Sequence, residues 1–274
     1  MSKKCYIVAE LGSNCWPFTR EKFDKLLGAA KYADADAVKV QLFWSKHFPR
    51  EEQASKLPYV FPRGKLAWLR DRARGMGLGI GASVFDEGAV DLVADLGLDF
   101  LKLATREQYN IDLRRYASKR FHGTIIRSVS YPPGYQVNRM PREVTLGCIP
   151  RYPTRKPHWY WLHDIGTTLP HPWGWSSHTL LFEDCLIAAI KGASVIEKHL
   201  YYSENDPEYR WSMPASHFKF MVRMIRTYEA DSDMLQLRRE YDQAMGRLKF
   251  MELGYRRKAM AADELMHELE AKRR

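Results

Sequence analysis

Short apolar runs alternate with longer amphipathic stretches along most of the chain. Apolar runs bounded by turn residues predict buried strands, and apolar residues at three- and four-residue spacing predict helices. The strand pattern occurs at residues 6–9, 37–42, 78–84, 100–104, 124–126, 144–146, 173–175 and 194–196. The helical pattern occurs at residues 20–32, 65–76, 87–96, 110–119, 181–191 and 218–228.

This alternation of strands and helices predicts a parallel sheet with right-handed crossovers. Eight such units over about 230 residues favour a closed (β/α)8 TIM barrel over an open doubly wound sheet. No Gly-x-Gly-x-x-Gly or Walker loop follows a strand, which also disfavours an open-sheet nucleotide binder. One unit differs, because residues 128–144 carry three prolines and no helical stripe. We therefore expect an irregular fifth βα unit without its helix.

We expect one barrel domain at residues 1–230 and a helical C-terminal tail at residues 231–274. The tail is charged and too short for a second domain, so its expected role is a solvated or subunit-contacting helix. The hydrophobic content of 45% and charged content of 28% exclude a disordered or collagen-like chain. No signal peptide or run of about 18 apolar residues is present. The four cysteines form no CxxC pair, so reduced thiols and a cytoplasmic location are expected.

The net charge of +10 raises the question of a phosphorylated or polyanionic partner. A local surplus of Arg151, Arg155 and Lys156 lies beside the aromatic-rich segment 158–161. No nucleic-acid-binding motif accompanies it, so binding to nucleic acid is disfavoured. A small phosphate ester accounts for the charge equally well.

Polar residues at the C-terminal ends of barrel strands are candidates for an active site, because all eight βα loops meet on that face. Those residues are Glu10, Asn14, Lys39, Gln41, Ser83, Lys102, Thr105, Glu107, Ser176, His178, Glu197, Lys198 and His199. Two lysines among several hydroxyls suit a ligand with both a phosphate and a carboxylate. Each residue alone also has a structural explanation, such as an ion-paired strand lysine. A purely structural explanation is less convincing for the run Glu197–Lys198–His199, since three ionisable groups at one strand end must be paired or functional.

His178 and His199 follow adjacent strands, so their imidazoles are placed to share one divalent cation. Glu107 is the candidate to complete the coordination, directly or through water. A lone histidine is more often a hydrogen-bonded structural residue, and the metal hypothesis therefore depends on the pair.

At these positions the chain resembles the N-acetylneuraminate (sialic acid) synthase family, which condenses phosphoenolpyruvate with an amino-sugar aldehyde. Seven short runs, found in the family's order over about residues 5–230, carry the resemblance. They are 9–14 (AELGSN), 33–41 (ADADAVKVQ), 82–86 (ASVFD), 102–107 (KLATRE), 152–154 (YPT), 174–179 (GWSSHT) and 192–199 (GASVIEKH). Each run alone is weak, whereas the ordered set is specific.

The resemblance implies a TIM-barrel transferase that forms a C–C bond and uses a divalent metal, Mn²⁺ or Mg²⁺. The metal would polarise the aldehyde, C3 of phosphoenolpyruvate would attack it, and water would add at C2 before phosphate leaves. By position, His178 and His199 would ligate the metal with Glu107 near it. The residues that would hold phosphoenolpyruvate are Lys39, Ser83, Lys102, Thr105 and Ser176. The catalytic candidates are Glu10, Glu107, Lys102 and Glu197, and the sugar-binding candidates are Glu10, Gln41, Tyr152 and Glu208.

The chain departs from the family mainly where the acceptor sugar would bind. Cys15 stands where the family has His, Arg106 where it has Gly, and Ser177 where it has Asp. Pro150 lies near a family Asn, Glu208 takes the place of an Asp, and the C-terminal antifreeze-like domain is not seen. We therefore hypothesise a changed acceptor, because Arg106 would either shrink the pocket or recruit an anionic sugar. Phosphate release from phosphoenolpyruvate, N-acetylmannosamine and Mn²⁺ at rates typical of the family would contradict this hypothesis.

Two functions remain open on the sequence. One is a phosphoenolpyruvate-dependent synthase that makes a nonulosonic, sialic-acid-like 2-keto acid, with small-molecule substrates and, by family analogy, a homodimeric state. The alternative is a catalytically silent barrel that acts as a binding or scaffold protein, which Arg106, Pro150 and the missing domain favour. Titration with metal and phosphoenolpyruvate separates them, because a scaffold need bind neither tightly.

Overall fold

The computed structural model describes residues 4–154, 162 and 164–231. Its compact unit spans residues 1–226, and of the second unit, 227–274, only the end of α8 and Asp231 are described. The helical tail expected at 231–274 therefore lies outside the described residues, apart from Asp231. No helix in the described ranges is long and apolar enough to cross a membrane.

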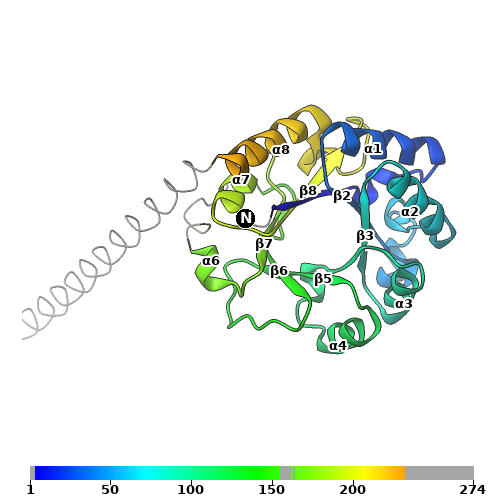
Figure 1. The fold of residues 1–274 in the computed structure, drawn as a ribbon. Helices are drawn as coiled ribbons and strands as arrows, with labels where there is room; N and C mark the ends of the chain where they lie inside the picture. The colour runs from blue at the N-terminus through cyan, green and yellow to red at the C-terminus, as the bar shows by residue number, and fades with distance from the viewer. Residues whose placement is uncertain (1–3, 155–161, 163, 232–274) are drawn as a thin grey trace, which may run out of the picture. The chain divides into compact units, whose positions relative to one another are not determined.

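Eight parallel strands form a closed barrel in chain order, with β1 hydrogen-bonded to both β2 and β8 (Figure 1). The strands are β1 Tyr6–Glu10, β2 Ala37–Gln41, β3 Gly79–Val84, β4 Phe100–Leu103, β5 Thr124–Ser130, β6 Glu143–Cys148, β7 Trp173–Ser177 and β8 Val195–Tyr201. A short strand that the sequence did not predict, β9 (Met213–Pro214), adds to β8 outside the barrel. The predicted (β/α)8 fold is confirmed.

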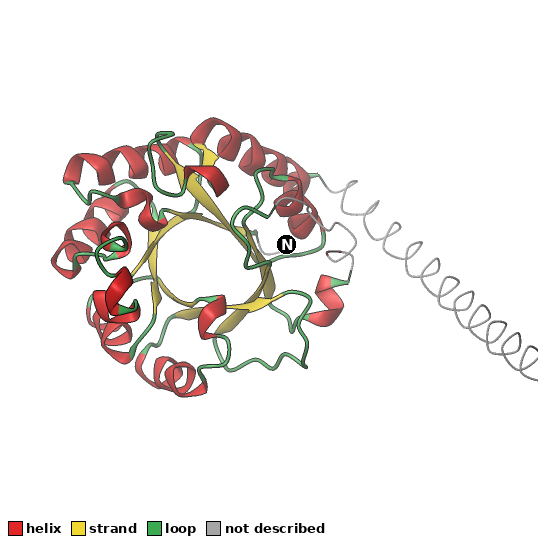
Figure 2. Ribbon diagram, turned by 180° about the vertical axis from the view of Figure 1, so that it is seen from behind, coloured by secondary structure: helices red, strands yellow, loops and turns green. Residues whose placement is uncertain are grey.

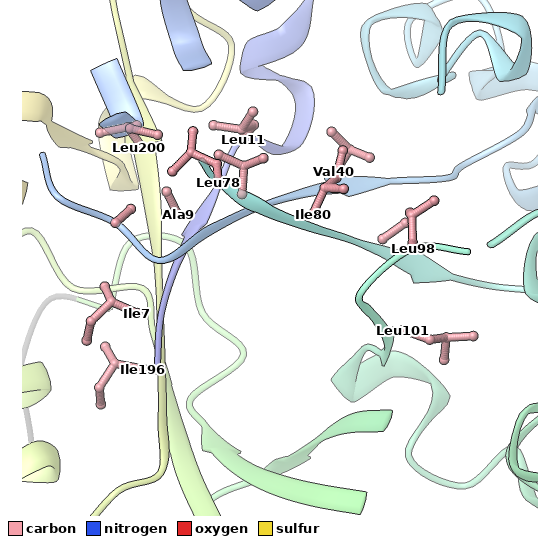
Figure 3. Close-up of a cluster of buried hydrophobic side chains, with 14 of the residues drawn as sticks. Ile7, Ala9, Leu11, Val40, Leu78, Ile80, Leu98, Leu101, Ile196 and Leu200 are labelled. Atoms are coloured by element: carbon pink, nitrogen blue, oxygen red, sulfur yellow. The ribbon is translucent and has the colours of Figure 1, made fainter. Parts of the chain in front are cut away.

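Helices surround the strands in a ring (Figure 2). They are α1 Arg20–Tyr32, α2 Leu66–Gly75, α3 Glu87–Asp95, α4 Ile111–Arg120, α6 Ile165–Thr168, α7 Glu183–Ile190 and α8 Ala215–Ala230. All but the four-residue α6 match a helix that the apolar spacing predicts. Their apolar faces pack on the outward side chains of the strands, such as Ile7, Ala9, Ile80, Leu101 and Ile196 (Figure 3).

The inside of the barrel has an apolar lower layer and a polar upper layer. The lower layer is a buried cluster of Val8, Ala37, Phe100, Ile126, Val144, Leu146 and Val195. Side chains two residues further along a strand lie on the same face. Two residues after Val8, Ala37, Phe100 and Val195 come Glu10, Lys39, Lys102 and Glu197. The lower layer therefore closes the barrel, and each of these strands delivers a charged group into its open end.

The fifth βα unit has no helix, as the prolines predict, and a loop joins β5 to β6 (Figure 1). A buried polar cluster lies under this loop. Arg114 of α4 donates to both carboxylate oxygens of Glu143, at 2.7 and 2.6 Å, and to the Asn138 side chain at 3.0 Å. Arg127 of β5 donates to the Asn138 carbonyl at 2.7 Å. Charged groups thus occupy the strand face that an apolar helix would cover elsewhere in the barrel.

Removing the charge of Glu143 is expected to destabilise the fold strongly. The change Glu143→Gln leaves Arg114, only 5% exposed, without its buried carboxylate. Breaking a buried pair in this way costs about 3 kcal/mol or more. Asp24→Asn provides the control, because it breaks the exposed pair with Arg72 and is expected to cost about 1 kcal/mol or less. Urea unfolding of the two variants checks this, and similar losses of stability in both would contradict it.

Candidate active site

A cavity of about 360 Å³ opens at the C-terminal ends of the barrel strands. Most of the sequence-predicted site residues line it: Glu10, Lys39, Gln41, Ser83, Lys102, Thr105, Tyr152, Ser176, His178, Glu197 and His199. They come from β1, β2, β3, β4, β7 and β8 or from the loops that follow strands. The barrel thus brings together side chains that are almost 190 positions apart along the chain.

Two buried lysines and two buried carboxylates form one network at the floor of the cavity. Lys39 contacts the carboxylate of Glu10, and its Nζ lies 2.6 Å from Ser83 Oγ and 3.7 Å from Glu197 Oε2. Lys102 contacts Glu197 Oε1, which also accepts a hydrogen bond from Ser176 Oγ at 3.0 Å. Glu197 therefore lies between the two lysines and links them.

The network shifts the titration of its members. Burial lowers the pKa of Lys39 to about 7, against the attraction of Glu197 and with the help of the Lys102 charge. Burial favours the neutral form of Glu197, but Lys102 and Lys39 outweigh it and lower its pKa to about 2. The floor therefore holds an ionised Glu197 beside a lysine that exchanges its proton near neutral pH.

His178 and His199 form the next part of the cavity wall, with ring centroids 5.3 Å apart. His178 Nδ1 lies 3.0 Å from the Ile149 carbonyl, and His199 Nδ1 lies 2.9 Å from Glu208 Oε2. Where these oxygens accept the Nδ1 proton of a neutral ring, its Nε2 carries a lone pair. Burial, and next the proximity of His199, lower the pKa of His178 well below its ordinary range. His178 therefore has the form that imidazole needs to ligate a cation, and His199 Nδ1 has an acceptor that leaves its Nε2 for the same role.

The described residues contain no cluster of three or more His, Cys, Asp or Glu placed to hold a metal ion. Among the residues that the structure describes, a cation at this site would therefore find two imidazole ligands, with water or substrate oxygens as further ligands. The two free Nε2 atoms fit such a partly open site, which is the arrangement of metal ions that act on a substrate.

Glu107, expected near the metal, does not line the cavity. It lies in the 3₁₀ turn η6 (Thr105–Glu107), where successive side chains point about 120° apart. Thr105 and Arg106 therefore face the cavity, whereas Glu107 accepts a hydrogen bond from Asn110 Nδ2 at 2.9 Å and pairs with Arg106 Nε at 3.3 Å. The expectation that Glu107 completes the metal coordination does not match this geometry.

Glu208, expected at the sugar, lies behind His199 and does not line the cavity. Gly12, with a φ of +46°, leaves the space that the Glu208 carboxylate fills, and a side chain there would collide with it. Asn14 accepts from the Glu208 amide at 2.7 Å and donates to the Leu200 carbonyl at 2.9 Å. The 9–14 run thus holds the segment after β8 in place, and Glu208 contacts His199 from behind the cavity lining.

Lys198 points away from the cavity, as expected for a residue between two inward-facing neighbours. Its Nζ donates to Ser177 Oγ at 2.8 Å and contacts the Thr179 carbonyl. These contacts lie outside the barrel and give Lys198 a structural role.

Several cavity residues were not predicted from the sequence, namely Phe43, Phe85, Gln108, Ser130 and Cys148. Ser130 was missed because the predicted fifth strand ended at residue 126, whereas β5 runs on to Ser130. Extending the two-residue period from Ile126 would have found it. Cys148 follows from Leu146 in the same way. Phe43 and Phe85 lie just beyond β2 and β3, where their aromatic character was the available signal.

Residues 26–234 of the chain match the family model described as "NeuB family". The chain belongs to this family. Among curated proteins it is 26% identical over 261 residues to N,N'-diacetyllegionaminic acid synthase of Legionella pneumophila, covering 83% of this chain and 73% of that protein. It is 27% identical over 172 residues to pseudaminic acid synthase of Helicobacter pylori, covering 58% of this chain and 51% of that protein. The resemblance to sialic acid synthases is thus confirmed at the level of the family.

Solved structures with the same fold include two bacterial proteins. One is an N-acetylneuraminic acid synthetase from Leptospira borgpetersenii in complex with citrate, with a TM-score of 0.72, 20% identity and coverage of 89% of this chain and 93% of that one. The other is the spore coat polysaccharide biosynthesis protein spsE of Bacillus subtilis, with a TM-score of 0.67, 24% identity and coverage of 85% and 73%. At these identities the likeness supports the barrel fold.

Proposed function

We propose that this NeuB-family chain is a synthase that condenses phosphoenolpyruvate with an amino-sugar-type aldehyde to give a nonulosonic, sialic-acid-like 2-keto acid. The observation that carries the proposal is the floor of the cavity, where Lys39 and Lys102 flank Glu197 beside the His178–His199 pair. The names of the two curated synthases support the same reaction class.

Phosphoenolpyruvate would bind across the floor, because it carries both anions that the two lysines suit. The hydroxyls of Ser83 and Ser176 contact this network, and Thr105 lines the cavity above Lys102. Bidentate and charge-assisted hydrogen bonds of this kind fix phosphate and carboxylate groups. An anion between the lysines would replace part of their present attraction to Glu10 and Glu197.

His178 and His199 would hold a divalent ion, Mn²⁺ or Mg²⁺, through their Nε2 atoms. Such an ion, when bound, supplies Lewis-acid polarisation of the acceptor's carbonyl oxygen. Glu208 keeps His199 in the required tautomer, and Tyr152, whose ring centroid lies 4.1 Å from that of His178, restricts the other ring.

In the proposed reaction, C3 of phosphoenolpyruvate bonds to the aldehyde carbon, water adds at C2, and the bond from C2 to the phosphate oxygen breaks. The new hydroxyl gains one proton. The attacking water gives up both of its protons, one as it adds at C2 and one as C2 becomes a carbonyl and phosphate leaves as hydrogen phosphate. Glu10 is the carboxylate in the cavity that is suited to accept a proton from water, because the pKa of Glu197, about 2, makes that carboxylate a weak base. Lys39, whose pKa lies near 7 in the free protein, is the group suited to return one.

A catalytically silent barrel remains the second candidate. Arg106 and Pro150, two of the departures from the family pattern, both line the cavity. They leave the floor intact, so this candidate requires no phosphate release, whether or not phosphoenolpyruvate binds tightly.

Phosphate release tests the proposal directly. With Mn²⁺ and phosphoenolpyruvate, the chain is expected to release phosphate only when an aldehyde such as N-acetylmannosamine or its 6-phosphate is added. Lys39→Met is expected to lower kcat/KM at least about 100-fold, because the substrate anions lose a buried charge partner. The exposed Lys25→Met, which breaks a surface pair with Glu21, serves as the control. Binding of phosphoenolpyruvate by calorimetry without any phosphate release would favour the silent barrel instead.

The affinity for phosphoenolpyruvate is expected to fall as pH rises above about 7. Burial lowers the pKa of Lys39 to about 7 in the free protein, whereas a bound anion raises it, so binding takes up a proton. Above pH 7 the phosphate, whose second pKa is about 6, is already fully charged and does not mask this effect. Calorimetry at pH 7 to 9, in buffers of different ionisation enthalpy, measures the proton uptake. An affinity that is flat over this range, or the same slope in Lys39→Met, would contradict the prediction.

Glu208 and Glu107 are expected to differ in their effect on metal binding. Glu208→Gln weakens the acceptor for His199 Nδ1–H and should lower Mn²⁺ affinity about 10- to 100-fold. Glu107→Gln should leave it unchanged, because Glu107 lies outside the cavity. Calorimetric titration with Mn²⁺ checks both variants. A loss of Mn²⁺ affinity in Glu107→Gln alone would instead support the metal-coordinating role that the sequence suggested for Glu107.

A further inference from the structure

One wall of the cavity has no part in the groups described so far. Phe43 follows β2, Phe85 follows β3, and Arg106 lies on η6 after β4, and all three line the cavity. The Phe43 and Phe85 rings stack at 3.8 Å with an interplanar angle of 12°. We call these three side chains the Arg106 wall.

The Arg106 guanidinium lies beside this aromatic pair. Its Cζ is 5.4 Å from the centroid of Phe43 and 5.5 Å from that of Phe85, which places it next to the edges of the two stacked rings. Its Nε pairs with Glu107 at 3.3 Å, and the described part of the chain offers no further ionic partner. The side chain is thus held at Nε and lies beside the aromatic rings, while its two Nη groups make no hydrogen bond or ion pair within the described residues and stay available to a ligand.

The charge of Arg106 is not balanced inside the cavity. Lys39 and Lys102 pair with Glu10 and Glu197, which line the cavity with them. The partner of Arg106 is Glu107, which does not line it. A ligand in the cavity therefore meets a guanidinium whose carboxylate partner lies outside the cavity lining, and a planar fork of this kind binds phosphate or carboxylate groups in a bidentate manner.

The barrel places the Arg106 wall across from the histidines. In a closed barrel of eight strands in chain order, β4 stands opposite β8 and β3 opposite β7. Arg106 follows β4 and Phe85 follows β3, whereas His199 belongs to β8 and His178 follows β7. An acceptor that has its carbonyl at the histidines and spans the mouth of the cavity would therefore reach Arg106.

We propose that Arg106 selects an acceptor sugar that carries an anionic group, a phosphate or a carboxylate, at the end far from its aldehyde. This inference rests on the proposed synthase function and names the class of its second substrate. Two effects were considered for Arg106, a smaller pocket and recruitment of an anion. The guanidinium contacts Glu107 only through Nε, which leaves both Nη groups for a ligand and favours the second effect.

Calorimetry with three probes tests the selection without turnover, in the presence of Mn²⁺ and the absence of phosphoenolpyruvate. The probes are N-acetylmannosamine, its 6-phosphate and the corresponding 6-carboxylate. The wild-type chain is expected to bind at least one anionic probe about tenfold or more tightly than the neutral sugar, the smallest effect expected of hydrogen bonds to a charged group. Arg106→Met is expected to reduce the preference to within about twofold, and Arg106→Lys to retain part of it.

Two variants separate this effect from others. Arg63→Met removes a guanidinium that stacks on Trp44, with its Cζ 3.0 Å from the ring centroid, outside the cavity lining, and is expected to behave as wild type. Lys39→Met weakens the floor, so a preference that survives in it does not come from the sugar phosphate binding at the phosphoenolpyruvate site. Loss of the preference in Lys39→Met but not in Arg106→Met would overturn the proposal.

The outcomes also separate this inference from the proposed function. Equal affinity of the wild-type chain for neutral and anionic sugars overturns the role of Arg106, even if phosphate is released in the turnover assay. Tighter binding of the neutral sugar in Arg106→Met, with the anionic probes unchanged, assigns Arg106 a purely steric role and also overturns it. A preference that depends on Arg106, found without phosphate release, supports the anion site and contradicts the synthase reaction.

Discussion

Two lysine ammonium groups lie inside a closed barrel, and the arrangement of the site depends on how their charge is balanced. A buried ion without a partner costs several kcal/mol, so Lys39 and Lys102 require Glu10 and Glu197 in the same layer. The strand register supplies these partners, since Glu10 stands beside Lys39 in the β1–β2 pairing. A dianionic substrate offers the lysines the same compensation, and this makes exchange between carboxylate and substrate energetically accessible.

The sequence predicted the features that depend on local pattern. The eight strands, the longer helices and the missing fifth helix follow from apolar spacing and from the prolines of residues 128–144. The inward residues of the strands follow from the two-residue period, which is why Lys39, Lys102 and Glu197 were found. Ser130 and Cys148 follow the same two-residue period. They were not predicted because the expected strands end at residues 126 and 146, before these positions.

Glu107 and Glu208 were expected at the site but do not line the cavity. Their positions depend on contacts that no local sequence pattern indicates. The direction of Glu107 is set by a single 3₁₀ turn, a difference of one residue in a short loop. The position of Glu208 is set by Asn14, which is 194 positions away, and by the space beside Gly12. The sequence motifs indicated which segments lie near the barrel mouth. Tertiary packing, however, determines which of their side chains face the cavity.

The barrel keeps the groups proposed to bind phosphoenolpyruvate apart from the groups proposed to select the acceptor. The groups at the floor lie on the strands themselves, where the pairing of each strand with its neighbours fixes the position of its side chains. Phe43, Phe85 and Arg106 lie one or a few residues beyond the strand ends, in segments that carry no part of the barrel's hydrogen bonding. Substitutions there can diversify which molecule is accepted while the bond-forming apparatus stays constant. The fold thus gives evolution, or a protein engineer, a set of positions at which new products arise without rebuilding the catalyst.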